Sequence, residues 1–584
     1  MNFKTSKYEF TSSSKYGITM SVVEEREDYL KLKIHIDFGE KLSPEPTVVK
    51  WEIPCVDIFS QWNANTWTHS RSLEPYWRGV HATSRSASWH PVQLHMSMAG
   101  QNRHTVALSD PLTPIEIASG IMEETANIVF KLTFFTQKIS AIKEYETEMI
   151  IDTRDLPYYD VLEDVKKYWE SLGFIPAAFP EEAITPMYST WYSYHQNLDR
   201  KTIVEELKLA KEYGMKTVIV DDGWQTLDNN RGYAFCGDWE PEKLTDIKEL
   251  VEDVHALGMK YMMWYSVPFV GNGTKAWKRF EGKFLDWYEE NQRWCVFDVR
   301  YPDVRDYLIS LYENAVKEWK LDGFKLDFID LLTLTKWSKE PNDEMDFESL
   351  EDAICAFVKE AKQRLEKLNP DILIEFRQAY MGPIMSAYGN MIRVADCPAD
   401  PVKNRVGSID LRLTAGNTPI HSDMLMWHYD DTVESAALEF INIMFCVPQI
   451  SVLIEKLPEK HKKMLKFYLD LWLENRDTLL FGKLVAKNPE ANYSIVTSEK
   501  DKNIVAVSYT KNVLEAEREF DKIIFVNGSW DNELIINNKC EPYNARVTIK
   551  DCMGNTLFEE ECEIFDGFNV FDVSKSGVLE TNRV

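Results

Sequence analysis

Short apolar segments alternate with amphipathic helical patterns through the middle of the chain, and this rhythm constrains the fold more than any other feature. Helical patterns such as TIVEELKLAKEYG and VRDYLISLYENAVKEW separate most of the segments. No helix opens with a GxGxxG or Walker pattern, so the repetition predicts a (β/α)8 TIM barrel rather than a doubly wound sheet. The eight candidate strands are MYSTWYSY, TVIVDD, KYMMWY, GFKLDF, DILIEF, MIRVAD, PIHSDM and PQISVLI.

Antiparallel β patterns flank this region on both sides. Before it, runs such as LKLKIHIDF, TVVKWEI and YETEMIID alternate apolar and polar residues between turn residues. After it, runs such as NIVAVSY and NARVTIKD do the same. The sequence therefore predicts a multidomain α/β protein. It has an N-terminal antiparallel β-sandwich over residues 1–178, the barrel over 179–485 and a small C-terminal antiparallel β domain over 486–584.

Charge and cysteine usage narrow the class of protein. The formal net charge is −28, with basic and acidic residues mixed along the chain, so a nucleic-acid partner is not expected. There is no signal-peptide core and no apolar run of membrane length. The nine cysteines are scattered without CxxC pairs. We therefore expect a cytoplasmic protein with free thiols, no membrane partner and neither a metal nor a cofactor.

Two carboxylates stand at the ends of different candidate strands. Asp327 ends GFKLDF, where alternation puts Lys325 on the same face, and Asp396 ends a strand two positions later. Lys325 should lower the pKa of Asp327 and keep it ionised, which suits a nucleophile. Burial beside Cys397 could raise the pKa of Asp396, which suits a general acid, unless Arg393 pairs with it directly. Such a pair, about 5–5.5 Å apart, performs retaining glycosidic cleavage; structural ion pairs are the alternative.

Further polar and aromatic residues follow the same strand ends. Asp221 and Asp222, in DDGW, could accept hydrogen bonds from two hydroxyls of one sugar, or could form only a helix-capping turn. Asp400 competes with Asp396 for the acid role. The His421-Ser422-Asp423 run resembles part of a hydrolase triad, but without a GxSxG elbow a serine mechanism is disfavoured. The remaining candidates are Trp191 on the first strand, Trp264 on the third, Arg293 in NQRWCVFDV and Arg377 at the end of the fifth.

The order of these motifs is similar to that of a known family. The segments WYSYHQ, TVIVDDGWQ, GDWEP, LGMKYMMWYSVP, NQRWCVFDVRYPDVRDYL, DGFKLDF and RVADCPADP resemble the barrel of the melibiase-type α-galactosidases of glycoside hydrolase family 36. The resemblance implies a retaining, metal-free mechanism with Asp327 as nucleophile and Asp396 as acid/base. It implies that Asp221 and Asp222 bind the 4- and 6-hydroxyls of galactose. The other substrate-binding positions that it implies are Trp264, Arg293 and Lys325.

Two stretches depart from the family pattern. Where the family often has Cys and a glycine run near the C2 group of the sugar, this chain has the sequence EFRQAY from Glu375 to Tyr380. Arg377 is therefore expected either to favour an acceptor such as a hydroxyl at C2, or to be held by Glu375. The acid/base stretch is ADCPADP where many members have SDxTD. The DDGWQ spelling resembles the raffinose-synthase-like branch, which leaves galactosyl transfer open.

We therefore predict a retaining exo-glycoside hydrolase that cleaves terminal α-galactosides from short oligosaccharides. The alternatives are another α-glycosidase such as an α-N-acetylgalactosaminidase, a galactosyl-transferring enzyme, and an inactive carbohydrate-binding barrel. The aromatic segment 59–78, with Trp62, Trp67 and Trp77, predicts a loop that reaches the barrel mouth from its own chain or a neighbouring one. Such a loop would make the protein a homo-oligomer.

Overall fold

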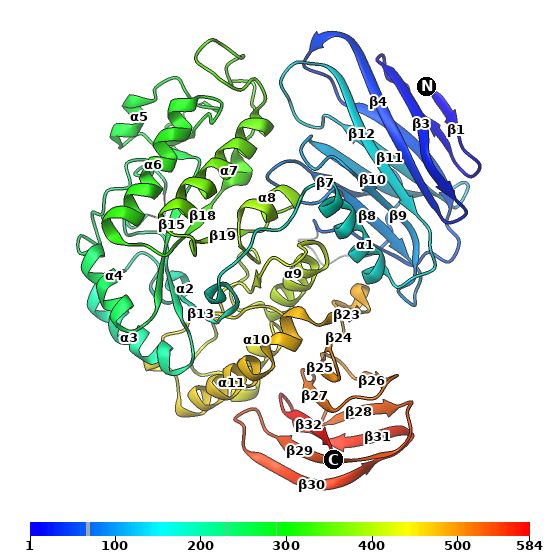
Figure 1. Cartoon of the computed structure of the whole chain (residues 1–584), viewed down its shortest axis with the longest axis vertical. Coiled ribbons are helices and arrows are strands. Elements are labelled where there is room, and N and C mark those ends of the chain that lie inside the picture. The colour runs from blue at the N-terminus through cyan, green and yellow to red at the C-terminus, as the bar shows by residue number, and fades with distance from the viewer. Residues whose placement is uncertain (66–70, 231, 288) are drawn as a thin grey trace.

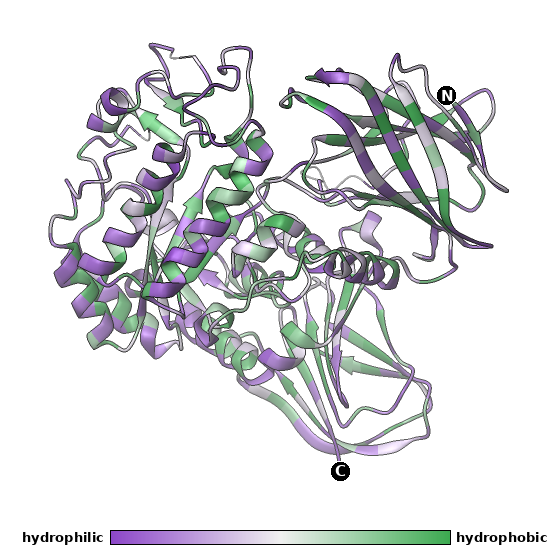
Figure 2. Ribbon diagram, turned by 45° about the horizontal axis from the view of Figure 1, so that its top comes forward, coloured by the Kyte–Doolittle hydropathy of each residue, from purple (hydrophilic) through white to green (hydrophobic). Residues whose placement is uncertain are grey.

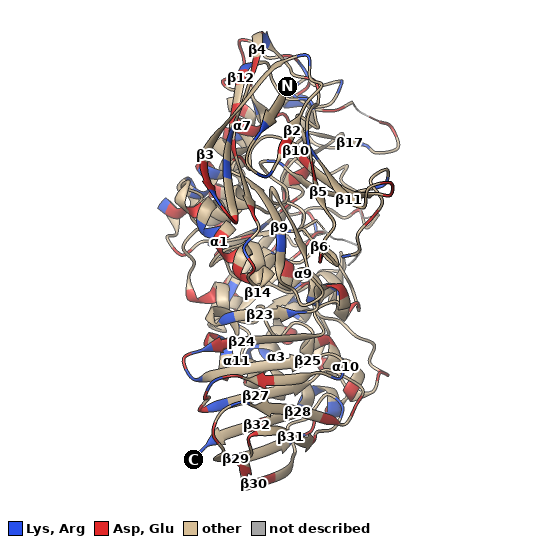
Figure 3. Cartoon of the chain, turned by 90° about the vertical axis from the view of Figure 1, so that its right-hand side faces the viewer, with Lys and Arg blue, Asp and Glu red and all other residues tan. Residues whose placement is uncertain are grey.

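The chain has three parts. The computed structural model describes residues 1–65, 71–230, 232–287 and 289–584. In Figure 1 the N-terminal sheets lie at the upper right, the barrel and its helices fill the left, and the C-terminal sheets lie at the bottom. Figure 3 shows the N-terminal and C-terminal sheets at opposite ends of the long axis, with acidic and basic residues interspersed. This arrangement confirms the fold class predicted from the sequence.

Two six-stranded antiparallel sheets make up the N-terminal part, ordered β1-β2-β5-β11-β10-β7 and β3-β4-β12-β9-β8-β6. Their strands are β1 Asn2–Lys4, β2 Glu9–Thr11, β3 Gly17–Arg26, β4 Tyr29–Leu42, β5 Thr47–Pro54, β6 Ser60–Trp62, β7 Val80–Ser84, β8 Val92–Met96, β9 Asn102–Leu108, β10 Ile115–Met122, β11 Asn127–Phe134 and β12 Ile142–Asp152. Hydrophobic and hydrophilic residues alternate along them (Figure 2), so each sheet buries one face. Leu32, Trp51 and Phe130, from both sheets, share one core.

A helix that the sequence reasoning did not anticipate links these sheets to the rest of the molecule. Helix α1 (Tyr158–Ser171) follows β12, and its buried residues recur with helical spacing. Tyr158 Oη donates to the carbonyl of Ala486, in the region that follows the barrel. Trp169 Nε1 donates to the carbonyl of Leu108 in β9. The last strand of the region predicted as a β-sandwich over residues 1–178 is therefore β12, which ends at Asp152.

Eight parallel strands form the barrel in the order β21-β20-β19-β18-β15-β14-β13-β22. Parallel bridges from His421 to Val447 and from Leu425 to Ile450 close it. Each predicted segment overlaps one strand: β13 Met187–Ser189, β14 Thr217–Val220, β15 Lys260–Ser266, β18 Gly323–Asp327, β19 Leu373–Arg377, β20 Met391–Arg393, β21 Ile420–His421 and β22 Gln449–Ile450. The expectation that Trp191 lies on the first strand is wrong, because β13 ends at Ser189 and WYSY forms helix α2 (Trp191–Tyr194).

Helices cover the outside of the barrel (Figure 1). Side-chain caps fix where several begin: Asp199 accepts from the amide of Thr202 at α3, and Ser349 accepts from that of Asp352 at α7. The helices are α3 Arg200–Glu212, α4 Ile247–Ala256, α5 Lys275–Arg279, α6 Pro302–Trp319, α7 Leu350–Leu368, α8 Pro383–Tyr388, α9 Pro401–Thr414, α10 Val433–Ile441 and α11 Glu459–Phe481. A hairpin of β16 (Phe269–Gly271) and β17 (Trp294–Val296) extends from the end of β15.

The C-terminal part begins directly after α11 and contains a seven-stranded sheet, β23-β24-β25-β27-β32-β29-β30, and a three-stranded sheet, β26-β28-β31. Most neighbouring pairs are antiparallel, but β25 and β27 run parallel, as do β26 and β28. The strands are β23 Lys483–Lys487, β24 Ile495–Lys500, β25 Asn503–Ser508, β26 Val513–Ala516, β27 Lys522–Asn527, β28 Glu533–Asn538, β29 Tyr543–Lys550, β30 Thr556–Ile564, β31 Gly567–Asp572 and β32 Val578–Arg583.

A buried polar cluster joins the three parts. Arg71 of the N-terminal part donates to both carboxylate oxygens of Asp410 on α9, at 2.6 and 2.7 Å. Trp62 Nε1 donates to Asp410 Oδ1 and to Tyr493 Oη, and Tyr493 also donates to Asp410. Arg71 and Asp410 are 2% and 1% exposed. The cluster therefore depends on residues from all three parts being docked together.

The helices within the described ranges include none that is both long enough and apolar enough to cross a membrane. All nine cysteines are free thiols.

Candidate active site

Asp327, at the end of β18, is the most heavily hydrogen-bonded carboxylate at the barrel mouth. Its Oδ1 accepts from the Phe328 amide at 2.9 Å, from Arg377 Nε at 3.0 Å and from Tyr380 Oη at 2.7 Å. Its Oδ2 accepts from Trp264 Nε1, on β15, at 2.9 Å. Burial alone would raise the pKa of Asp327, but Arg377, Lys325 and these hydrogen bonds together lower it. Asp327 is therefore a buried carboxylate that stays ionised.

Arg377, at the end of β19, is the cation that contacts Asp327 directly. The sequence reasoning expected Lys325 to play this part. Instead, Lys325 Nζ donates to Asp221 Oδ2 at 2.6 Å and acts on Asp327 only through its charge. The Arg377 guanidinium lies 5.2 Å from the ring centroids of both Phe328 and Tyr380.

The Asp221–Asp222 pair follows β14 and is buried, at 2% and 5% exposure. Besides Lys325, Asp221 accepts from the backbone amide of Asp222 at 2.9 Å. Asp222 accepts from Gln225 Nε2 at 2.8 Å and from Gln196 Nε2 at 2.9 Å. Burial raises the pKa of Asp222 to about 6 despite these hydrogen bonds. The two acids are thus acceptors with lone pairs to spare.

An aromatic wall stands beside these acids. The rings of Tyr233, Phe269, Trp294 and Phe328 contact one another, with centroids 4.1 to 5.8 Å apart. The charges of Asp327 and Asp222 both contribute to raising the pKa of Tyr233 beyond the effect of its burial, so this ring lies near both acids. An apolar wall next to buried acceptors suits a hydroxylated ligand with an apolar face.

Arg393, at the end of β20, ties three carboxyl groups together. It is buried and donates to Asp396 at 2.9 Å and to Asp423, and its Nε lies 3.6 Å from Glu375 Oε1. Of the two possibilities that the sequence left open for Asp396, the direct pair with Arg393 is the one that the structure contains. Burial acts to raise the pKa of Asp396, but the positive charges of Arg393, Lys325 and Arg377 outweigh it and hold the pKa below its usual range. The side chain of Asp396 is also 51% exposed, so it can reach a ligand.

Sequence reasoning named Asp423 and Glu375 but did not place them in this cluster. Asp423 accepts from Tyr192 Oη at 2.9 Å and from the Cys397 amide at 2.6 Å, and Glu375 accepts from Gln449. Burial raises the pKa of both acids despite Arg393. Their position at strand ends was visible in the sequence, but a tyrosine or glutamine partner carries no spacing signal. The site residues that it did not single out are Tyr380, Gln196, Gln225 and Tyr233.

The run from His421 to Asp423 forms no catalytic triad. His421 Nε2 faces the carbonyl of Ala183 at 2.8 Å, and Ser422 Oγ accepts from the backbone amide of Gln449 at 3.0 Å. Asp423 is bound to Arg393. The serine is therefore not activated by the histidine.

Three of the predicted site residues make their described contacts away from the acids. Arg293 is exposed and its guanidinium lies 5.8 Å from the ring of Phe235. Asp400 is exposed and caps α9 by accepting from the amide of Lys403 at 3.0 Å. Trp191 is half-buried on α2, with its ring 4.8 Å from that of His195. These contacts give the three residues no direct link to Asp327 or Asp396.

Trp62 and Trp77 of the aromatic segment 59–78 differ in their surroundings. Trp62 lies in the cluster between the three parts and is fully buried there, not at the barrel mouth. Trp77 is 68% exposed. Trp67 lies outside the described residues.

The site as a whole holds more acids than bases. In the part of the chain that the structure describes, three cations lie among six carboxyl groups, so the cluster favours ligands that donate hydrogen bonds or develop positive charge. Within the described ranges, His, Cys, Asp and Glu side chains form no group of three or more that could hold a metal ion. The cations are Lys325, Arg377 and Arg393, and the acids are Asp221, Asp222, Asp327, Glu375, Asp396 and Asp423.

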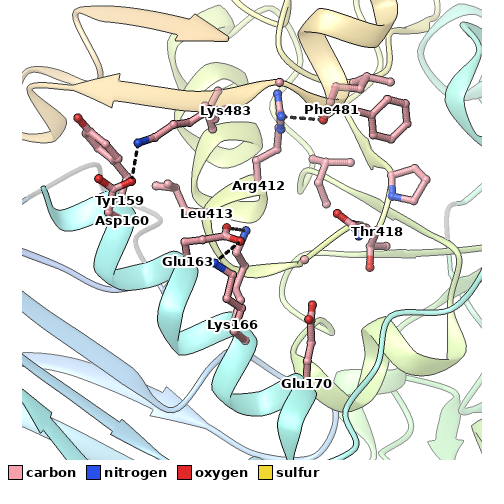
Figure 4. A pocket seen from close by; sticks show the side chains of 18 of the residues that line it. Tyr159, Asp160, Glu163, Lys166, Glu170, Arg412, Leu413, Thr418, Phe481 and Lys483 are labelled. Carbon is pink, nitrogen blue, oxygen red and sulfur yellow. Dashed lines mark hydrogen bonds and ion pairs between the residues drawn. The ribbon is translucent and has the colours of Figure 1, made fainter. Parts of the chain in front are cut away.

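A cavity of about 650 Å³ lies elsewhere, between α1, the end of α9 and β23 (Figure 4). Lys483 and Asp160 form an ion pair 3.0 Å apart on its wall. Pro419 and Ile420 also line it, so it lies by the amino end of β21. The acids of the site follow the carboxyl ends of the strands, so this cavity is at the opposite end of the barrel.

Comparisons with known proteins point to one family. Residues 166–387 match the family model described as Melibiase. The α-galactosidase AgaA of Geobacillus stearothermophilus is 24% identical over 163 residues, which cover 26% of this chain and 21% of AgaA. The bifunctional α-galactosidase/sucrose kinase AgaSK of Mediterraneibacter gnavus is 26% identical over 129 residues, covering 19% of this chain and 14% of AgaSK. The aligned segments thus span about a fifth or less of these relatives.

Solved structures agree over nearly the whole chain. The galactosidase domain of AgaSK superposes with a TM-score of 0.64 at 12% identity, covering 99% of this chain and 82% of that one. The family 36 α-galactosidase AgaA from Geobacillus stearothermophilus gives 0.64 at 14% identity, covering 99% and 83%. At this identity the likeness establishes the fold. Residues 166–387 are therefore similar to the Melibiase family, in a chain that has the fold of the family 36 α-galactosidases.

Proposed function

We propose that this protein is a retaining exo-α-galactosidase that acts on short oligosaccharides. The observation that carries the proposal is Asp327, a buried, ionised carboxylate that, among the described residues, has one donor on Oδ2 and three on Oδ1. Related proteins support the substrate class: those matched in sequence are named α-galactosidases, and two of the superposed AgaA structures are complexes with raffinose and stachyose.

The chemistry is a double displacement. Asp327 attacks the anomeric carbon, the bond from that carbon to the leaving oxygen breaks, and Asp396 gives its proton to the departing oxygen. Asp396, now a carboxylate, then takes a proton from water as the water attacks the anomeric carbon and releases Asp327. Galactose keeps its configuration because the two inversions cancel.

Asp396 fits the acid role through its exposure and not through its pKa in the free protein. Asp423 and Glu375 have raised pKa values, but both are 0% exposed and cannot touch a substrate. Asp396 is half-exposed and becomes buried when the leaving group covers it. Such burial raises the pKa of a carboxyl, and this opposes the effect of Arg393.

Asp221 and Asp222 are proposed to recognise galactose. Two buried acceptors on adjacent hydroxyls form charge-assisted hydrogen bonds, which are stronger than neutral ones. The Asp222→Ala variant should lose about 10²-fold or more in kcat/KM. The lysine bound to Asp221 keeps that carboxylate in place without occupying Asp222.

The decisive experiment is proton NMR of the first-formed sugar. An aryl α-galactoside should release α-galactose first, and the β anomer should appear only by mutarotation. Initial release of β-galactose would show inversion and contradict the mechanism. No turnover of any aryl α-glycoside would favour a carbohydrate-binding protein instead.

A further inference from the structure

A side chain of the N-terminal part holds the backbone that follows Asp327. Arg85 comes directly after β7 and is 8% exposed. Its Nη1 donates to the carbonyl of Leu332 at 2.8 Å, and its Nη2 donates to the carbonyl of Asp330. Both carbonyls belong to the segment that begins at the end of β18, where Asp327 lies. One guanidinium thus connects the N-terminal sheets to the segment after the proposed nucleophile.

The backbone at Arg85 is itself held in place. The amide of Arg85 donates to the carbonyl of Ser88, and the amide of Ser88 donates to that of Arg85, both at 2.9 Å. The Ser86 amide donates to the carbonyl of Leu112 at 3.0 Å. Burial lowers the pKa of the Arg85 guanidinium, so its hydrogen bonds to the two carbonyls compensate for the loss of water. The turn therefore presents Arg85 from a fixed position.

The segment that Arg85 holds supplies a hydrogen bond to Asp327. Phe328 has a left-handed backbone, with φ of 66°, and precedes the short 3-10 helix Ile329–Leu331. In this conformation the Phe328 amide donates to Asp327 Oδ1 at 2.9 Å. Residues other than glycine rarely adopt a positive φ, and they keep it only where the surrounding structure imposes it. The hydrogen bonds from Arg85 to the carbonyls that follow provide such a restraint.

The residue after the turn contacts a second segment that supplies a donor to Asp327. The Trp89 amide donates to the carbonyl of Ala379 at 3.3 Å. A Cβ at Gly382 would lie 2.4 Å from the carbonyl oxygen of Trp89, so the two backbones are in direct contact there. Tyr380, between these two contacts, donates to Asp327 Oδ1 at 2.7 Å. Residues 85–89 therefore contact both backbone segments, the one after β18 and the one after β19.

Hydrogen bonding sets the orientation of the Asp327 carboxylate. Among the described residues Oδ1 accepts from three donors and Oδ2 from one, so Oδ2 keeps a free lone pair for attack. The donor that residues 85–89 do not hold is Arg377. Glu375, the other partner expected for Arg377, contacts Gln449 and Arg393 instead. Attack needs a separation of roughly 3–3.5 Å, and a misplacement of about 1 Å can cost about 10²-fold in rate.

We propose that Arg85 is a positioning residue, through which the N-terminal part fixes the backbone after β18 so that the Phe328 amide orients the Asp327 carboxylate for attack. The proposal rests on the proposed α-galactosidase activity. Arg85 acts through the carbonyls of Asp330 and Leu332 and not on the sugar, so its loss slows attack more than it weakens sugar binding. The N-terminal part thus takes part in catalysis.

The test is the Arg85→Lys variant, which keeps the charge but lacks the fork that reaches both carbonyls. Its kcat on an aryl α-galactoside should fall by about 10- to 100-fold, and so should the rate at which a fluorinated galactosyl fluoride labels Asp327. The dissociation constant of galactose, measured by calorimetry, should change by less than about threefold. Arg85→Gln, which buries no charge, gives the same comparison if the lysine variant does not fold.

Arg412→Lys is the matched control. Arg412 also donates to backbone carbonyls, those of Leu479 at 2.6 Å and Leu480 at 2.8 Å. It lies by the cavity at the opposite end of the barrel (Figure 4). Both lysine variants should lower Tm, but at a temperature where both are folded only Arg85→Lys should lower kcat. Lys138→Ala removes an exposed ion pair between the N-terminal part and Glu340, and should leave both Tm and kcat unchanged.

The outcomes separate the positioning role from the activity. If the wild type cleaves galactosides but Arg85→Lys keeps its kcat and labelling rate, the positioning role is overturned and the activity stands. The role is also overturned if Arg412→Lys loses as much kcat, or if galactose affinity falls as much as kcat does. If the wild type neither cleaves aryl α-galactosides nor binds galactose, the proposed function and the positioning role are both overturned.

Discussion

At the scale of single residues, the site is governed by which cation pairs with which acid. Lys325 pairs with Asp221, Arg377 with Asp327, and Arg393 with Asp396 and Asp423. These ion pairs shift the pKa values of the carboxyl groups, and the two catalytic roles need different pKa values. A nucleophile needs a low pKa, which Arg377 helps to provide, whereas an acid needs a proton, which Arg393 makes harder to hold.

The Asp396→Asn variant should lose activity according to the leaving group. With raffinose, whose leaving oxygen must be protonated, kcat/KM should fall by about 10²–10⁴-fold. With an activated aryl galactoside the loss should be below about tenfold. Steady-state kinetics on both substrates measure this. Equal losses would move the acid role elsewhere.

The low pKa of Asp396 has a consequence for pH dependence. An acid must be protonated, and a lowered pKa means that the proton is lost as pH rises through the acidic range. For the wild type, kcat/KM on raffinose should therefore fall with rising pH before kcat/KM on an activated substrate does. The same profile on both substrates would contradict this.

The ionisation of Asp222 should make galactoside binding depend on pH near 6. Its pKa is raised to about 6, and only the ionised form accepts hydrogen bonds with both oxygens. Galactoside binding should therefore weaken as pH falls through 6. The Gln196→Met variant removes one donor to Asp222, which should move this pH dependence to higher pH. A pH dependence that stays in place would show that another group titrates.

The strand ends made much of the site predictable from the sequence. Asp221, Asp222, Lys325 and Asp327 lie where alternation and the barrel pattern put them. The partners could not be predicted from the sequence, because the pairing of Lys325 with Asp221 joins residues 104 positions apart. The sequence left open whether burial or Arg393 would set the pKa of Asp396, and the pair with Arg393, three residues earlier, lowers it.

At the scale of elements, short β strands were easier to predict than the helices beside them. All eight barrel strands are buried apolar segments bounded by helices, which is a strong pattern. WYSY has the same apolar character and is a helical turn, because Tyr192 and Ser193 amides bind Ser451 beside β22. Helix α1 is the opposite case: a helix formed where the sequence predicted part of a β-sandwich, because strand patterns dominate the region before it.

A buried acid on helix α10, Glu439, makes the free energy of unfolding depend on pH. Burial, with Asp400 and Asp431 nearby, raises the pKa of Glu439 from 4.5 to about 8. The folded state keeps a proton that the unfolded state releases, so the free energy of unfolding falls as pH rises from about 4.5 to 8. The slope is at most about 1.4 kcal/mol per pH unit.

Glu439→Gln should remove this slope, because the amide does not ionise. Relative to the wild type, the variant should gain stability between pH 5 and pH 8, as measured by urea denaturation at both. Glu434→Gln, in the first turn of α10, is the control and should show no such gain. An unchanged stability difference at the two pH values would contradict the prediction.

At the scale of the whole molecule, one buried carboxylate, Asp410, takes part in the contact between all three parts. Asp410→Ala leaves Arg71 buried without its ion-pair partner. Such a loss costs about 3–5 kcal/mol, far more than that of an exposed pair. Thermal unfolding and limited proteolysis should show weakened docking of the N-terminal part.

The control for this prediction is Asp306→Ala, which removes an ion pair with Arg364 where Asp306 is 69% exposed. It should cost less than about 1 kcal/mol. Equal effects of the two substitutions would show that the buried cluster does not hold the parts together. The homo-oligomer expected from the aromatic segment stays a prediction, since Trp62 serves this internal contact.

The central claim is that Asp327 forms a covalent bond to the sugar. A fluorinated galactosyl fluoride that traps the glycosyl-enzyme should add one sugar mass to the protein, and peptide mapping should place it on Asp327. Asp327→Asn should remain folded, take up no label and lose at least about 10⁴-fold in kcat. A label on another residue, or full turnover by Asp327→Asn, would contradict the account.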